Sequence, residues 1–345
     1  MPKGVSKDKG TKISVIGGGA WGTALAQHLA RNGHFVHLWV MEEEVVQSVN
    51  RRHTNDLYLP GIRLHKKVVA SRSLEECCAG SQLLVFATPA QHLRSVLQKI
   101  RPLLKPKMIL VSVSKGIETK SGKLLAEIYE DLLPRALYRR LAFLSGPSFA
   151  REVALGQPTA VTVAALSPQV GRTVQHFFGA PFFRVYTSDD IIGVELGGAI
   201  KNVIAIAAGI VDGLGFGYSS RAGMMTRALH EMTRLGIRMG ASPLTFMGLS
   251  GLGDMILTCT GDLSRNRTVG LELGKGKKLG AILKSMKAVS EGVPTAVAVH
   301  KLSRRYKVEM PICEQVYQIL YKGKSPRRAL QELTARPLKR ETEGI

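Results

Sequence analysis

Lys201 and Asn202 are the side chains best suited to chemistry in this sequence, because they lie in an otherwise small and apolar stretch. The run Val-Glu-Leu-Gly-Gly-Ala-Ile-Lys-Asn-Val occupies 194–203, and Ile-Ala-Ile-Ala-Ala follows it. A lysine ammonium is strongly hydrated, so its burial is costly unless a partner or a task compensates. A lysine held in this way can lose its proton near neutral pH and act as an acid or base. The alternative is a lysine that snorkels out of a buried helix.

A glycine-rich turn near the N-terminus predicts a phosphate-binding site. Gly17-Gly18-Gly19-Ala20-Trp21-Gly22 fits the pattern G-x-G-x-x-G. It follows a predicted strand at 12–16 and precedes a helix that stops at Asn32-Gly33, before a second strand at 34–40. Gly17 permits the tight turn, Gly19 lets the backbone approach a pyrophosphate, and Gly22 lets the helix pack on the strand. With the amides of the helix N-terminus, this order predicts a dinucleotide-binding unit.

The end of the second strand favours NAD over NADP. An acidic residue there binds the ribose hydroxyls of NAD, whereas a basic residue accepts the additional phosphate of NADP. The sequence reads Val40-Met41-Glu42 and continues with two further glutamates, with no cation at 40 or 41. Arg51-Arg52-His53 on the following predicted helix keeps NADP open as the alternative cofactor.

Three further strands are predicted at 82–87, 108–113 and 142–145, with a helix at 90–101. The loops that follow these strands contain Thr88-Pro89, Lys115-Gly116 and Gly146-Pro147-Ser148. Ligands bind at the carboxyl ends of strands in sheets of this kind. Lys115 is therefore a candidate site residue, and an ordinary exposed loop lysine is the alternative.

From about residue 193 the strand pattern stops and helical patterns dominate. Ser219-Ser220 is expected to cap a helix that runs to Gly240. A glycine-rich turn at 248–253 ends in Asp254, and a final amphipathic helical pattern covers 311–333. In Ser264-Arg265-Asn266-Arg267, the guanidinium and amide groups suit an oxyanion such as a phosphate, although a basic surface loop has the same composition. We therefore expect an α/β Rossmann-like N-terminal domain with a doubly wound, mostly parallel sheet at 1–192, and an all-α C-terminal domain at 193–345.

The composition restricts the partners of the chain. The formal net charge is +22, and 301–340 contains 11 Lys/Arg against 3 Glu. Such a charge suits nucleic acid, anionic membrane or phosphorylated small molecules, but no nucleic-acid motif accompanies it, so we interpret it as a solvated basic surface without a nucleic-acid partner. No apolar run reaches the length of an integral membrane segment and the N-terminus lacks the core of a signal peptide, so we expect a cytoplasmic protein.

The four cysteines, Cys77, Cys78, Cys259 and Cys313, fit neither a zinc site nor a disulfide framework. We expect them to be reduced and mostly packed, and we expect no metal.

Taken in chain order, these motifs closely resemble NAD(P)-dependent glycerol-3-phosphate dehydrogenases of the bacterial type. The resemblance runs from about residue 11 to about 333. It rests on Gly-Gly-Gly-Ala-Trp-Gly-Thr-Ala-Leu (17–25), Tyr-Leu-Pro-Gly (58–61), Val-Ser-Lys-Gly-Ile-Glu (113–118), Leu-Ser-Gly-Pro-Ser-Phe-Ala (144–150), Gly-Gly-Ala-Ile-Lys-Asn-Val-Ile-Ala (197–205), Gly-Leu-Gly-Asp (251–254), Thr-Cys-Thr (258–260), Ser-Arg-Asn-Arg (264–267) and Glu-Gly-Val (291–293).

The resemblance implies reversible hydride transfer between NAD(P)H and dihydroxyacetone phosphate, giving sn-glycerol 3-phosphate for glycerophospholipid synthesis. Lys201 would exchange the proton on the C2 oxygen, Lys115 would face cofactor and substrate and lower the pKa of Lys201, and Asp254 would orient Lys201. The implied substrate-binding residues are Lys115, Gly146, Ser148, Lys201, Asp254, Ser264, Arg265 and Asn266. The implied cofactor-binding residues are Gly17, Gly19, Ala20, Trp21, Gly22, Tyr58, Lys115, Ala150, Arg265, Val289 and Glu291. We also expect a homodimer.

Two departures from the family pattern bear on the cofactor. Ala20 replaces a serine that is common after the third glycine, and Val40-Met41 replaces a polar or basic pair often present in NADP-using members.

Two alternative functions remain open from the sequence. One is another reductase of the β-hydroxyacid or ketopantoate group, and the other is a non-catalytic nucleic-acid-binding protein, which would leave the glycine motif unexplained.

Overall fold

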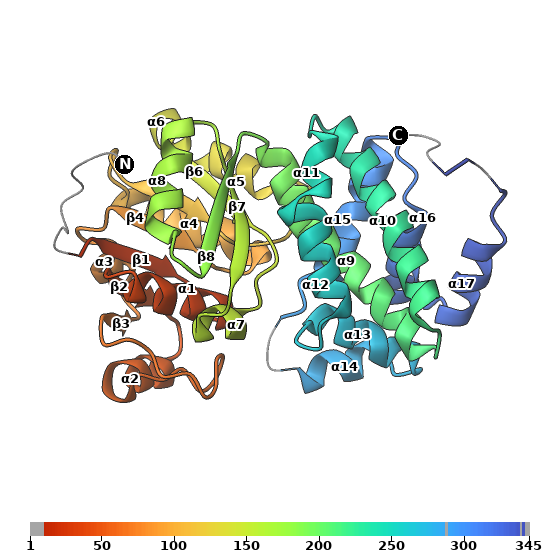
Figure 1. Cartoon of the computed structure of the whole chain (residues 1–345), viewed down its shortest axis with the longest axis horizontal. Coiled ribbons are helices and arrows are strands. Elements are labelled where there is room, and N and C mark those ends of the chain that lie inside the picture. Colours follow the sequence, from red (N-terminus) through yellow and green to blue (C-terminus); the bar gives the residue numbers. More distant parts are fainter. Residues whose placement is uncertain (1–9, 287–288, 339, 342–345) are drawn as a thin grey trace.

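The computed structural model describes residues 10–286, 289–338 and 340–341. It shows a sheet-containing N-terminal part beside an all-helical C-terminal part (Figure 1). The basic N-terminal segment, in which we expect no signal peptide, lies outside the described residues except for Gly10.

One eight-stranded sheet has the order β3-β2-β1-β4-β5-β6-β7-β8. The neighbouring strands are parallel except β6 and β7, which are antiparallel. Their bounds are β1 Lys12–Ile16, β2 Phe35–Trp39, β3 Val68–Ser71, β4 Leu83–Phe86, β5 Ile109–Ser112, β6 Leu141–Ser145, β7 Thr159–Ala165 and β8 Phe183–Ser188. The expected doubly wound, mostly parallel sheet is confirmed, and β3, β7 and β8 are strands that the sequence pattern did not predict.

Helices cover both faces of the sheet, because the side chains of each strand alternate between the faces. Ile13 and Val15 of β1 join a core formed with α1, α2, α7 and α8, whereas Ile16 joins a second core formed with α4, α5 and the start of α9. The helices of this part are α1 Ala20–Arg31, α2 Glu43–Arg52, α3 Leu74–Cys78, α4 Leu93–Ile100, α5 Leu125–Leu132, α6 Arg135–Tyr138, α7 Ala150–Leu155 and α8 Pro168–Phe178, with short 3₁₀ turns η1 Ala90–His92 and η2 Arg101–Leu103.

The predicted helix at 90–101 is therefore α4 with a 3₁₀ turn at each end. The strand order reverses between β1 and β4, and ligands bind outside the carboxyl ends of the strands at such a reversal. The loops after β1, β4, β5 and β6 all reach this edge of the sheet, and they carry the glycine turn, Thr88, Lys115 and Gly146.

The C-terminal part is built around the long helix α9, Ile191–Gly213, which packs against α10, α12, α13, α15 and α16. Although α9 has the length and apolar character of a membrane-spanning helix, 94% of its most apolar stretch is buried within the protein, as in a core helix. The other elements are α10 Tyr218–Arg238, α11 Pro243–Met247, the π-helical turn η3 Leu249–Gly253, α12 Asp254–Thr260, α13 Arg265–Gly274, α14 Leu279–Ser285, α15 Gly292–Arg305, α16 Pro311–Lys322 and α17 Pro326–Thr334.

One expectation for this half is wrong, and the structure divides a second predicted segment into two helices. Gly217, not Ser219 or Ser220, is the N-cap of α10, so both serines lie within its first turn. The amphipathic pattern at 311–333 is two helices, because Gly323 adopts a left-handed backbone (φ 69°) that ends α16. The sheet ends at Ser188 and α9 begins at Ile191, and the domain division at 192 stays a prediction.

Candidate active site at the junction of the sheet and the helical domain

Lys201 extends from the middle of α9 into a buried polar cluster. Its ammonium donates to Oδ1 of Asp254 and to Oγ1 of Thr258, both at 2.7 Å. Asp254 is the first residue of α12, and Thr258 lies one turn later on the same helix. The Lys201 side chain is only 8% exposed. It is therefore a buried lysine with two side-chain partners, rather than one that snorkels to solvent.

A second ammonium shares the same carboxylate. Lys115, in the loop after β5, donates to Oδ2 of Asp254 at 2.6 Å and to the carbonyl of Gly146 at 3.0 Å. Asp254 is 1% exposed, so both of its oxygens face lysines in a nearly dry environment. The sheet domain and the helical domain thus each contribute one lysine to this cluster.

The electrostatics of the cluster depress the basicity of Lys201. Burial lowers the pKa of Lys201 from 10.5 to about 8, because the charged ammonium loses its hydration. The nearby Asp254 carboxylate opposes this shift in the pKa, and the positive charge of Lys115 adds to it. The thiol of Cys259 has a small opposing influence on the same pKa. Lys201 consequently has a pKa at which both of its protonation states are accessible near neutral pH.

The Gly146 turn requires glycine because of its backbone conformation and its close approach to β7. Its backbone has φ of 142°, a conformation rarely adopted by other residues, and an added Cβ would lie 2.9 Å from Cα of Val161. The Gly146 carbonyl accepts from Lys115 and also from Oγ of Ser148, at 2.9 Å. This turn positions both side chains at the carboxyl end of β6.

Arg265 begins helix α13, which packs against α9 and α12, the helices that carry Lys201 and Asp254. Ser264 caps the helix by accepting the amide of Arg267 at 3.2 Å, and the Arg267 guanidinium is engaged by Asp212 and Asp262. Within the described part of the chain, Arg265 makes no hydrogen bond or ion pair and is exposed. Of the two guanidinium groups in this loop, only that of Arg265 is therefore placed to bind a ligand.

Asn266 faces inward instead. Its amide nitrogen donates to Oδ1 of Asn202 at 2.9 Å, and its Oδ1 accepts from Oγ of Ser290 at 2.6 Å and from the amide of Gly292 at 2.9 Å. This buried network joins α9, α13 and the start of α15. Helices α9 and α13 approach closely because Gly209 and Gly270 present no Cβ to the facing backbone.

The glycine turn has the features expected of a pyrophosphate cradle. Gly17 has φ of 121°, and an added Cβ would lie 2.8 Å from the carbonyl oxygen of Ala87. A Cβ on Gly22 would overlap the carbonyl of Gly17, whereas one on Gly19 would meet only open space. Within the described residues no side chain caps the N-terminus of α1, so its first amides are available to bind an anion. The residues present therefore fit a dinucleotide.

Other residues expected at the cofactor lie around this cradle. Ala20, Trp21, Tyr58 and Ala150 are partly buried against the core beneath the turn, and Nε1 of Trp21 is buried without a partner among the described residues. The Tyr58 hydroxyl donates to the Glu42 carboxylate at 2.7 Å.

Glu291, from the helical domain, accepts the amide of Ala90 at 3.0 Å with Oε1, so it reaches the loop after β4. Its second oxygen is buried without a partner in the described residues, and Val289 beside it is 50% exposed.

Two residues of the site had no predicted role: Thr258, which begins the Thr-Cys-Thr motif, and Asn202, which follows Lys201. The spacing of Asp254 and Thr258, four residues apart, is the signal for Thr258, because it puts them on one face of a helix. The four cysteines are free and buried, as expected. Within the described residues, no three His, Cys, Asp or Glu side chains are grouped to hold a metal ion.

Comparison with known proteins agrees with this architecture. The model for the N-terminus of NAD-dependent glycerol-3-phosphate dehydrogenase matches residues 12–170, and the model for its C-terminus matches 190–331. The chain is 52% identical to glycerol-3-phosphate dehydrogenase [NAD(P)+] of Syntrophotalea carbinolica over 96% of this chain and 99% of that protein. It is 52% identical to the same-named protein of Geobacter sulfurreducens over 96% and 98%.

Solved structures extend this similarity. Glycerol-3-phosphate dehydrogenase from Coxiella burnetii superposes with a TM-score of 0.91 at 37% identity, covering 95% of this chain and all of that one. A ketopantoate reductase from Ralstonia eutropha shares only the fold, with a TM-score of 0.58 at 16% identity, covering 93% of this chain and all of that one. The matches to both domain models, and the 52% sequence identity over nearly the whole chain, show that the chain belongs to the NAD-dependent glycerol-3-phosphate dehydrogenase family.

Proposed function

We propose that Lys201 is the proton-exchanging group in the reduction of dihydroxyacetone phosphate to sn-glycerol 3-phosphate. A nicotinamide cofactor held at the glycine turn would supply the hydride for C2 and would accept it in the reverse direction. The Lys201 ammonium donates a proton to the C2 oxygen during reduction, and the neutral amine takes it back during oxidation. The observation that carries this proposal is the Lys201–Asp254–Lys115 cluster, which lies at the meeting point of the two domains and gives Lys201 a lowered pKa.

Asp254 and Lys115 have supporting roles in this proposal. Asp254 fixes the direction of the Lys201 ammonium and compensates its charge while that charge is present. Lys115 holds the other carboxylate oxygen and adds positive charge where the C2 oxygen becomes more negative. Removal of Lys201 leaves Asp254 still paired with Lys115, so its substitution tests the chemistry without leaving an unpaired buried carboxylate.

We propose that Arg265 holds the substrate phosphate. Its guanidinium lies at the N-terminus of α13, where the helix dipole also favours an anion, and two parallel hydrogen bonds suit a phosphate. Gly146, Ser148, Ser264 and Asn266 form the surrounding walls in this proposal. Ser264 and Asn266 act mainly through the backbone order they impose, because each is already used in an internal hydrogen bond.

We propose NAD as the preferred cofactor. The Tyr58 hydroxyl orients Glu42, whose acidic group suits ribose hydroxyls and repels a ribose phosphate. Gly17, Gly19, Ala20, Trp21 and Gly22 form the pyrophosphate cradle of this proposal, and Tyr58, Lys115, Ala150, Arg265, Val289 and Glu291 form the remaining cofactor contacts.

Steady-state reduction of dihydroxyacetone phosphate, measured with NADH and NADPH side by side, tests the substrate and the cofactor that we propose. We expect turnover of this substrate with a higher kcat/KM for NADH. A large advantage for NADPH would overturn the cofactor assignment. Faster turnover of unphosphorylated 2-keto acids or ketopantoate would overturn the substrate assignment.

We also propose that the enzyme acts as a cytoplasmic homodimer in glycerophospholipid synthesis, with no nucleic-acid partner. The net charge of +22 then attracts its anionic substrates rather than a nucleic acid. Sedimentation of the purified chain tests the dimer. Salt-sensitive retention of duplex DNA or RNA that survives Lys201→Ala would contradict the assigned partners.

A further inference from the structure

The loop that carries Lys115 has little regular structure of its own, so contacts from neighbouring elements have to fix it. Residues 113–124 connect β5 to α5 without a helix or strand. Ile117 and Leu124 are buried in the core of the helical domain, although they belong to the chain of the sheet domain. The loop therefore passes from the sheet into the other domain, and Lys115 lies close to its start.

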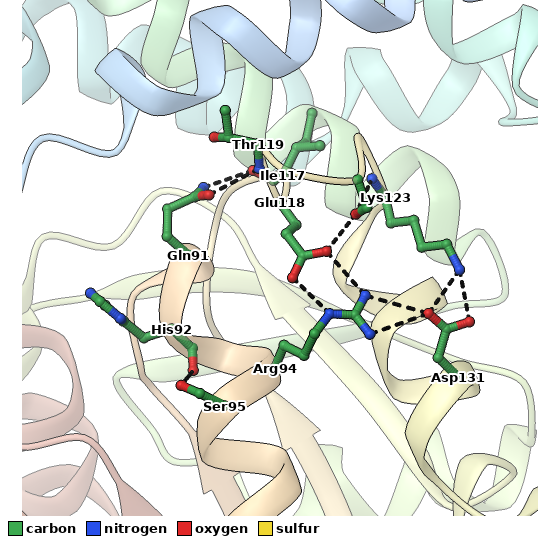
Figure 2. Close-up of polar contacts among 10 residues, drawn as sticks. Gln91, His92, Arg94, Ser95, Ile117, Glu118, Thr119, Lys123 and Asp131 are labelled. Carbon is green, nitrogen blue, oxygen red and sulfur yellow. Dashed lines mark hydrogen bonds and ion pairs between the residues drawn. The ribbon is translucent and has the colours of Figure 1, made fainter.

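Gln91, in η1, binds the middle of this loop with both ends of its amide (Figure 2). Its nitrogen donates to the carbonyl of Ile117 at 2.8 Å, and its oxygen accepts the amide of Thr119 at 2.9 Å. These two bonds satisfy backbone groups on either side of Glu118. They fix the loop in the same way as a paired strand would.

Arg94 of α4 binds the side chain between those two backbone groups. Its Nε donates to Oε1 of Glu118 at 2.8 Å, and its Nη2 donates to Oε2 at 3.0 Å. Glu118 is 9% exposed, and Arg94 keeps the pKa of Glu118 below its usual value. Charge-assisted bidentate pairs of this kind are strong and directional. Because α4 packs on the sheet, the grip ties the loop to a rigid element.

The same guanidinium also contacts Asp131 of α5 at 3.4 Å, and Lys123 donates to both oxygens of Asp131 at 2.8 and 2.7 Å. The Lys123 ammonium is the outer member of this network and pairs with Asp131 rather than with the Glu118 carboxylate (Figure 2). The Lys123 carbonyl accepts the Glu118 amide at 3.0 Å, a backbone contact that Lys123→Ala retains. Lys123 therefore offers a matched control for the removal of Arg94.

The helical domain contacts the other side of the loop. Thr119 Oγ1 donates to the carbonyl of Pro294 at 3.3 Å, and Lys301 donates to the carbonyl of Thr119 at 2.9 Å. Both partners belong to α15, which also begins beside Glu291. The loop is thus held from α4 on one side and from α15 on the other.

We propose that Arg94 is a positioning residue for Lys115, because its bidentate grip on Glu118 keeps the loop where the Lys115 ammonium meets Asp254. The proposal rests on the function proposed above, in which Lys115 faces substrate and cofactor. Arg94 itself touches neither Lys115 nor Asp254, so it acts through the loop. Only two residues, Gly116 and Ile117, separate Lys115 from Glu118, and a loosened Glu118 therefore moves the lysine directly.

The test compares Arg94→Ala, Arg94→Lys and Lys123→Ala with the unchanged enzyme. We expect Arg94→Ala to lower kcat by about 10²-fold, the effect of a displacement of about 1 Å at a catalytic group. Arg94→Lys should recover only part of the activity, because an ammonium cannot form the bidentate pair. Added guanidinium ion should partly restore the Arg94→Ala variant, and Lys123→Ala should stay within about twofold.

The pH profile distinguishes positioning from a general loss of folded protein. Lys201 is faced by Asp254, Thr258 and Cys259 from α12 and by Lys115 from the loop. When Lys115 moves away, Lys201 loses a positive neighbour, so its apparent pKa in the kcat profile should rise in Arg94→Ala. A smaller kcat with an unchanged profile would overturn the proposal.

Two further variants keep the result interpretable. Glu118→Gln removes the charged pair from the other side and should reproduce the shifted profile if Arg94→Ala does not fold. Lys201→Met tests the proposed function separately, since its full activity would overturn that function whatever Arg94 does. Wild-type kcat in Arg94→Ala beside an inactive Lys201→Met would overturn only the positioning role.

Discussion

The Lys201 ammonium lies 2.7 Å from Oδ1 of Asp254, and this pair joins the central helix of the helical domain to the start of α12. The other oxygen of the carboxylate binds Lys115 from the sheet domain at 2.6 Å. The single negative charge of Asp254 therefore pairs with two lysine ammoniums. Burial removes water from the ammonium and lowers the pKa of Lys201 from 10.5 to about 8. The Asp254 carboxylate opposes this shift, and the positive charge of Lys115 adds to it.

Substitution of Lys201 by arginine should abolish turnover and leave the fold intact. A guanidinium retains its proton at neutral pH, so it cannot exchange one with the C2 oxygen. We expect kcat to fall by about 10²- to 10⁴-fold, the usual contribution of a general acid or base. Steady-state kinetics measures the loss, and NADH binding by fluorescence is the control. Turnover close to that of the unchanged enzyme would exclude Lys201 as the proton-exchanging group.

The two reaction directions should depend on pH in opposite ways. Reduction of dihydroxyacetone phosphate needs protonated Lys201, so its kcat should fall as the pH rises through about 8. Oxidation of glycerol 3-phosphate needs the neutral amine, so its kcat should increase over the same range. Stopped-flow rates of hydride transfer in both directions measure the two limbs. Parallel profiles would argue against a single group that exchanges the proton.

Asp254→Asn should destabilise the protein as well as inactivate it. The change leaves two buried ammoniums without their shared counter-charge, and breaking a buried ion pair in this way costs about 3–5 kcal/mol. Urea unfolding at pH 7 measures the free energy. Thr258→Val is the control, because it removes one neutral hydrogen-bond partner of Lys201 and should cost about 1–3 kcal/mol. An equal loss in both variants would mean that charge compensation is not the main role of Asp254.

Tyr58→Phe should weaken NADH binding while kcat is kept. The hydroxyl holds the Glu42 carboxylate at 2.7 Å, and its loss frees that carboxylate to rotate away from the ribose. We expect KM for NADH to increase by about tenfold, the equivalent of one hydrogen bond. Initial rates at varied NADH measure the change. An unaltered KM would show that the position of Glu42 does not depend on Tyr58.

Glu195 should make stability depend on pH. This carboxyl of α9 is buried, accepts the amide of Ala126 at 3.1 Å, and has a pKa raised by burial from 4.5 to about 8. The folded protein therefore binds a proton that the unfolded chain has released between about pH 4.5 and 8. The contribution of Glu195 to stability is present below that range and is lost as the pH rises through it.

Glu195→Gln should remove this dependence, because glutamine can accept the same amide without a charge. Thermal unfolding at pH 5.5 and pH 8 measures it. We expect a smaller difference in Tm between the two pH values in the variant than in the unchanged protein. A difference of the same size in both would show that Glu195 is not the titrating group.

The sequence by itself predicted the local features, because these depend on residues close together in the chain. The glycine turn after β1, the apolar helix with Lys201 and the loops that follow β4, β5 and β6 all lie where the pattern indicated. Strands β3, β7 and β8 were not predicted. β3 and β8 lie at the two edges of the sheet, and several of their side chains are exposed, so their hydrophobic pattern is weak.

Only the tertiary structure decided which of these groups meet. Lys115, Lys201 and Asp254 are separated by at least 53 residues, and no pattern shows that one carboxylate binds both lysines. The tertiary structure also distinguishes Arg265 from Arg267, which lie in the same short basic motif. Arg265 is exposed, whereas Arg267 forms an ion pair with Asp212. Burial is the physical reason, because it depends on how the helices pack and sets both the partners and the pKa of each charged group.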